Sequence, residues 1–71
     1  MIEIKIREED EFIKLGQALK LSGLADSGLD AKIEIQEGNV LVNGETECRR
    51  GKKIYAGDVI EFGGQQIKVE N

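Results

Sequence analysis

The sequence predicts a small α+β domain, and three patterns support this fold class. Isoleucines at positions 2, 4 and 6 alternate with charged residues, which is the period of a strand with one buried face. Apolar residues at positions 12, 15 and 19 have the spacing of one helix face. Two turn-forming dipeptides, Asn43-Gly44 and Gly63-Gly64, each separate two short segments, as in a β-hairpin. We expect residues 1–71 to form a single domain.

The N-terminal half is expected to contain one strand followed by two helices. The acidic run Glu8–Glu11 would lie at the start of the first helix, where the macrodipole favours negative charge. This helix would end near Gly23, because glycine suits the left-handed residue that follows many helices. Ser27 and Asp30 resemble a capping box at the start of a second helix that would end at Gly38. The interior of this segment also alternates as a strand would, so the pattern leaves both structures open.

The C-terminal half is expected to consist of four short strands. The run Val40–Val42 would pair across the Asn43-Gly44 turn with a returning strand. A turn over residues 55–58 would lead to a strand at 59–62, and Gly63-Gly64 would connect it to a closing strand at 65–70. The expected order is therefore β-α-α-β-β-β-β.

The composition argues against several classes of function. The chain has no histidine, which is the usual general base and the commonest metal ligand near neutral pH. Its single cysteine can form neither an internal disulfide nor a zinc site. No segment approaches the about 20 apolar residues that span a bilayer. We therefore expect a cytoplasmic protein that is not an enzyme, binds no metal or cofactor and does not contact a membrane.

The charges are distributed unevenly along the chain. The net charge is −4, which by itself would repel a nucleic acid. Acidic residues crowd the N-terminal third, whereas residues 48–57 contain no acid and four of the ten cations, Arg49, Arg50, Lys52 and Lys53. We expect an electric dipole with one basic edge.

Several short motifs occur together in one order and at specific spacings. They are Lys14-Leu15, Leu19, Gly23, Ser27, Ala31-Lys32, the Gly-x-Val-x-Val-Asn-Gly segment at 38–44 and the Gly-Asp-x-Ile segment at 57–60. In this arrangement, which covers residues 12–62, the chain resembles the RNA-binding domain named after ribosomal protein S4, in its small stand-alone bacterial form. It departs from the family pattern at Gly16, where an aspartate is usual, and at Gly28, where an arginine is usual. Without that arginine, one expected phosphate contact is missing.

The resemblance implies an S4-like (alpha-L) fold in which two helices pack on a small bent antiparallel sheet. It also favours a helix for residues 31–37. The implied partner is structured RNA, ribosomal or transfer RNA, in ribosome assembly or RNA metabolism, with protein partners on ribosomal particles. The candidate RNA contacts are Lys14, Ser27, Lys32, Asn43, Arg49, Arg50, Lys52 and Lys53.

These candidates differ in chemistry. Arginine can hold a phosphate with two parallel N–H donors, so Arg49 and Arg50 should contribute most. The simpler explanation is that Ser27 caps a helix and that Asn43 forms a turn, without contact to RNA. Tyr55 is expected at a strand edge, with stacking on a base as the alternative. Since the chain has only three aromatic residues, structured RNA is a better expected ligand than single strands.

Two other classes of function are consistent with the sequence. Ubiquitin-like sulfur carriers are similarly short and acidic, and they carry related Val-Asn-Gly-Glu and Gly-Asp-x-Ile-Glu-Phe segments followed by Gly-Gly. Their chemistry needs a free C-terminal glycine, whereas seven residues follow Gly64 here, so a carrier would have to be trimmed. The other class is a protein-binding adaptor whose basic edge meets an acidic partner.

Overall fold

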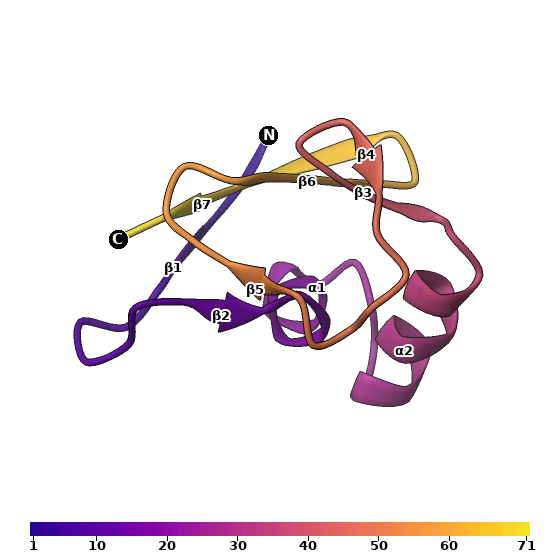
Figure 1. Ribbon diagram of the computed structural model, residues 1–71, viewed down its shortest axis with the longest axis horizontal. Coiled ribbons are helices and arrows are strands. Elements are labelled where there is room, and N and C mark those ends of the chain that lie inside the picture. The colour runs from indigo at the N-terminus through magenta and orange to yellow at the C-terminus, as the bar shows by residue number, and fades with distance from the viewer.

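The computed structural model describes residues 1–71 and shows a five-stranded sheet with two helices beneath it (Figure 1). The elements are β1 (Ile2–Lys5), β2 (Ile13–Lys14), α1 (Leu15–Ser22), α2 (Gly28–Gln36), β3 (Val40–Val42), β4 (Glu45–Thr46), β5 (Lys53–Ile54), β6 (Val59–Phe62) and β7 (Gln65–Glu70). The strand order in the main sheet is β1-β7-β6-β3-β4, and β2 and β5 form a separate antiparallel pair. Neither helix has the length and apolar character needed to cross a bilayer.

Both predicted hairpins are present. Asn43 and Gly44 connect β3 to β4 with φ angles of 52° and 85°, and Gly63 and Gly64 connect β6 to β7 with φ angles of 61° and 79°. These positive angles explain why the two turns contain glycine and asparagine. The sheet is mixed rather than purely antiparallel, because β1 pairs with β7 in parallel. Parallel neighbours need a long crossover, and here nearly the whole chain lies between the two strands.

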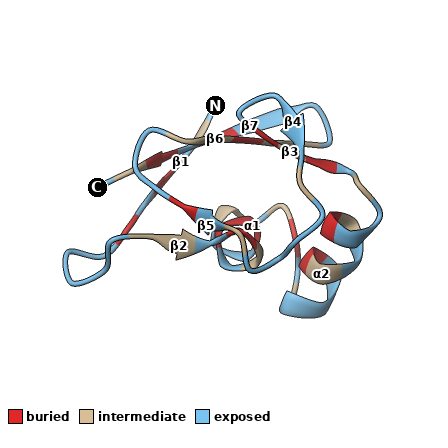
Figure 2. Cartoon of the chain, in the orientation of Figure 1, coloured by how far each residue is buried: buried red, intermediate tan, exposed pale blue.

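Buried residues, red in Figure 2, occur in the sheet and in both helices. Their apolar side chains form one core. The buried residues are all apolar: Ile4, Ile6, Leu15, Ala18, Leu19, Ala25, Ala31, Ile35, Val40, Val42, Ile54, Ile60, Ile67 and Val69. The strand members of this set follow the predicted period of two, with Ile67 and Val69 pointing to the same side of β7. The alternation in the sequence therefore determines which face of each strand meets the helices.

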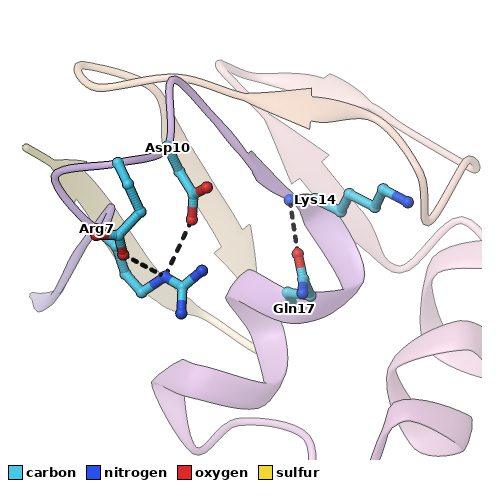
Figure 3. A network of polar contacts seen from close by, with 5 residues as sticks. Arg7, Asp10, Lys14 and Gln17 are labelled. Carbon is cyan, nitrogen blue, oxygen red and sulfur yellow. Dashed lines mark hydrogen bonds and ion pairs between the residues drawn. The ribbon is translucent and has the colours of Figure 1, made fainter.

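The start of the first helix differs from the prediction. α1 begins at Leu15, and the acidic run precedes it in a turn, where the Arg7 Nε lies 3.1 Å from Asp10 Oδ2 and 3.0 Å from Glu9 Oε1 (Figure 3). The hydrogen bond to Asp10 raises the pKa of the Arg7 guanidinium. The macrodipole argument was wrong for these acids because an extended segment, β2, separates them from the helix.

The second helix confirms the prediction for residues 31–37 except at its C-terminal end, where Gln36 is the last helical residue. The Ser27 Oγ accepts a hydrogen bond from the Asp30 amide at 3.2 Å and caps the helix. Ala31 and Ile35, which share a helix face, are fully buried, whereas Ile33 remains on the exposed side. The strand-like alternation was therefore misleading. The first helix ends as predicted at Gly23, which has a φ of 83°.

The fold also bears on the sulfur-carrier alternative. Gly63-Gly64 lies inside a hairpin, and the residues after it form β7. This strand pairs with both β1 and β6 and buries Ile67 and Val69. Trimming after Gly64 would thus remove an interior strand of the sheet, which is incompatible with a folded carrier.

The position of Ile67 yields a prediction about stability. Ile67→Ala should lower the free energy of unfolding by about 2–5 kcal/mol, because the side chain is fully buried and a cavity would remain. This is a large part of the stability of so small a domain. Urea unfolding followed by circular dichroism measures the change. The exposed neighbour Gln66→Ala is the control and should shift stability by less than about 0.5 kcal/mol. Equal stabilities of the two variants would contradict the burial of Ile67 in the core.

Candidate functional site

The segment between β4 and β5, residues 47–52, is here called the basic loop. Its backbone is attached to the start of α1, because the Leu15 amide donates to the Lys52 carbonyl at 2.9 Å and the Gly16 amide donates to the Arg50 carbonyl at 3.0 Å. The first amides of a helix have no acceptor within the helix, and the loop supplies two. In Figure 1 the loop descends from β4 and passes beside α1 before it enters β5. The start of α1 therefore positions the cationic segment.

A surface hollow of about 420 Å³, here called the basic hollow, lies where the loop and the two helices meet. It is lined by Lys14, Gly16, Gln17, Lys20, Gly28, Arg50 and Gly51. Three of these residues are cations, none is acidic, and none of the three cations forms a salt bridge. Such a site can hold an anion at the surface. The Gly28 position, where the family pattern has an arginine, contributes open space to it.

Lys20 is a site residue that the sequence analysis did not include. Lys14, the last residue of β2 directly before α1, and Gln17 and Lys20 in α1 are spaced by three residues, and all three line the basic hollow. This spacing was the available signal, but a lone surface lysine on a helix has no distinguishing pattern. The Lys14 amide donates to the Gln17 Oε1 at 3.3 Å, and the Lys14 side chain extends away from this contact (Figure 3).

A second hollow, of about 530 Å³, is lined by Arg49, Gly51, Lys52, Lys53 and Tyr55. Arg49 is not free, because its Nε donates to the Glu47 Oε2 at 3.0 Å and its Nη2 donates to the Glu47 Oε1 at 3.3 Å. The hydrogen bonds lower the pKa of the Glu47 carboxyl and raise that of the Arg49 guanidinium. Arg49 is thus partly neutralised, whereas Arg50 has no carboxylate partner. The two arginines are chemically distinct.

Ser27 and Asn43 have structural roles that account for them. The Ser27 hydroxyl caps α2, as described above. The Asn43 Nδ2 donates to the Asp58 Oδ1 at 3.0 Å, and its Oδ1 accepts from the Val59 amide at 2.9 Å. These bonds hold the β3–β4 turn against the start of β6, so the polar atoms of both side chains are engaged within the fold.

Lys32 is half-buried on α2 and has no salt-bridge partner. It lies one turn after Gly28 on the same side of the helix, which places it beyond the basic hollow. Among the predicted cations, Lys14, Arg49, Arg50, Lys52 and Lys53 lie in the basic loop or line the hollows beside it, whereas Lys32 lines neither hollow. No group of three or more cysteine or acidic side chains is arranged to hold a metal ion.

Comparison with known proteins adds an independent observation. The S4 domain family model matches residues 4–70. The "Probable ribosome maturation protein RlbA" of Bacillus subtilis is 50% identical over 56 residues, which cover 79% of each chain. The "Putative RNA-binding protein YbcJ" of Escherichia coli is 44% identical over 57 residues, which cover 80% of this chain and 81% of YbcJ. The solution structure of YbcJ, described as revealing an αL motif involved in RNA-binding, has a TM-score of 0.76 at 37% identity and covers 100% of this chain and 89% of that one.

The contact between Arg49 and Glu47 yields a prediction about the pKa of the Glu47 carboxyl. Hydrogen bonds to the ionised carboxylate lower the pKa of Glu47 in the folded protein. The pair therefore stabilises the fold fully at a pH above the ordinary pKa of glutamate, and this stabilisation is lost as the pH falls through the lowered pKa. An NMR titration of the side-chain carboxyl carbons should therefore give Glu47 a low midpoint. Arg49→Ala should return this midpoint towards the ordinary value, whereas Arg50→Ala should not move it. A midpoint unchanged in Arg49→Ala would contradict the pairing.

Proposed function

The chain belongs to the S4 domain family, and from this premise we propose that it is an RNA-binding protein whose contact surface is the basic loop with the basic hollow. The observation that carries the proposal is the meeting of Lys14 at the end of β2, Lys20 in α1 and Arg50 in the basic loop around a hollow without acidic residues. Each of these side chains is exposed and has no carboxylate partner. The protein acts by binding and not by catalysis.

The names of the relatives support RNA as the partner and the ribosome as its setting. The proposed ligand is ribosomal or transfer RNA, and the proposed role is in ribosome assembly or RNA metabolism in the cytoplasm. Protein partners on the same ribosomal particle are part of this proposal. The RNA would be recognised by the spacing of its phosphates, since the cations lie along the basic loop and around the basic hollow.

The cations are expected to contribute unequally. Arg50 and the lysines are free to neutralise phosphates, whereas Arg49 must first give up its contact with Glu47. The affinity for RNA should fall as the salt concentration rises. Each phosphate that a cation neutralises adds about −0.7 to −0.9 to the slope of log affinity against log salt concentration. Removal of the Arg50 side chain should therefore cause the largest decrease in RNA affinity and in its salt dependence.

The adaptor alternative would use the same cations to bind an acidic protein. Competition between ligands for the basic loop relates the two functions. Structured RNA should displace an acidic partner only if both occupy the basic loop, and heparin should displace either. The names of the relatives favour RNA as the first ligand to examine.

The RNA proposal predicts an unequal effect of two charge-neutralising variants. Arg50→Gln should weaken binding to a structured ribosomal RNA fragment roughly tenfold, which corresponds to about 1.4 kcal/mol for one charge-assisted contact. It should also reduce the salt slope by about 0.7 to 0.9. Titration of fluorescent RNA at several salt concentrations measures both quantities.

Lys68→Gln is the control for this experiment. It removes the same charge from β7, where Lys68 pairs with Glu70 at 3.7 Å, away from the basic loop. Affinity and slope should stay close to those of the unmodified protein. Equal effects of the two variants would show that only the net charge matters, and absence of binding at low salt would refute RNA binding itself.

A further inference from the structure

All three aromatic residues lie in or near strands, and two of them meet beside the basic loop. The rings of Phe12 and Tyr55 have centroids 5.9 Å apart and are tilted by 53°. The Lys53 Nζ lies 5.0 Å from the centroid of the Phe12 ring, within the range of a cation–π contact. The pair of strands β2 and β5 brings these residues together, since Ile13 lies opposite Ile54.

The Tyr55 ring is held in place but is not covered. The Tyr55 amide donates to the Asp58 Oδ2 at 2.8 Å, and its neighbour Ile54 is fully buried, so the backbone at this position is fixed. The residue is nevertheless 47% exposed. It lines the hollow of about 530 Å³ that also contains Arg49, Lys52 and Lys53, and a further hollow of about 380 Å³ on the side of the β3–β4 hairpin. An aromatic surface thus stands directly beside Lys52 and Lys53, which have no salt-bridge partner, and beside Arg49, which is paired with Glu47.

We propose that Tyr55 is a stacking site for one unpaired nucleobase of the RNA that the basic loop binds. The inference rests on the proposed function and adds a ligand preference to it. Lys52 and Lys53 can hold phosphates on either side of a nucleotide, and a base turned out from that backbone would reach the neighbouring ring. An exposed tyrosine ring is suited to this role because every base has a face that can stack on it.

The structural alternative is that Tyr55 only covers the edge of the β2–β5 pair. In that case its replacement would alter stability, or lower affinity for every RNA alike. Stacking instead predicts a preference for RNA helices that carry an unpaired nucleotide over fully paired helices. A single aromatic ring cannot form a track for long single strands, so an isolated bulged or loop nucleotide fits the geometry better.

The test compares three RNA hairpins of the same sequence. One stem is fully paired, one carries a single bulged adenosine, and one carries an abasic bulge at the same place. The unmodified protein should bind the adenosine bulge about tenfold more tightly than the other two, since an abasic bulge has the same flexibility but no base to stack. With 2-aminopurine in place of the adenosine, binding should quench its fluorescence.

Two variants assign this preference to Tyr55. Tyr55→Leu should remove the tenfold preference and the quenching while keeping the affinity for the paired stem, and Tyr55→Phe should retain both. If the unmodified protein binds the adenosine and abasic bulges equally, or if Tyr55→Leu lowers affinity for all three hairpins equally, the stacking proposal is overturned and RNA binding by the basic loop stands. If no hairpin binds at low salt, the proposed function fails as well. The comparison of the adenosine and abasic bulges uses the unmodified protein, so equal affinities would overturn the proposal even if Tyr55→Leu does not fold.

Discussion

The hydrogen bonds from the Leu15 and Gly16 amides to the basic loop determine where the cations of that loop lie. A helix start exposes amides that need acceptors, and here the carbonyls of Arg50 and Lys52 meet this need. The backbone of the loop is thereby turned towards α1 and its charged side chains are left at the surface. The β2–β5 pair continues the same attachment on the other side of Lys52. The Leu15 and Gly16 amides are consequently not available to an anion.

An acidic protein can present a basic surface where cations without a carboxylate partner lie close together. Arg7 contacts Glu9 and Asp10, Arg49 contacts Glu47, and Lys68 contacts Glu70. The cations that remain unpaired near the basic loop are Lys14, Lys20, Arg50, Lys52 and Lys53. At physiological ionic strength, exposed charges are screened over about 8 Å, so a phosphate at the loop responds to these neighbours more than to the net charge of −4.

Local signals in the sequence predicted much of the fold. The two hairpins follow from dipeptides that accept positive φ, and the core faces follow from the alternation of apolar residues. The start of α1 could not be predicted in this way, because the carbonyls that cap it come from residues 50 and 52, far along the chain. The parallel pairing of β1 with β7 is non-local in the same sense. For the site, residue types indicated the basic loop, but the contribution of Lys20 and the neutralisation of Arg49 depend on which side chains face each other.

The glycine at position 28 leaves open space in the basic hollow where the family pattern has an arginine. Its φ is not positive, and a Cβ at this position would meet no atom within 4 Å, so neither the backbone nor the packing requires glycine. Its effect is to leave the wall of the basic hollow on α2 without a side chain. Lys14, Lys20 and Arg50 then supply the positive charge from the end of β2, from α1 and from the loop. Because backbone hydrogen bonds join the start of α1 to the loop, the backbone positions of these three cations are fixed relative to one another without a contribution from a side chain of α2.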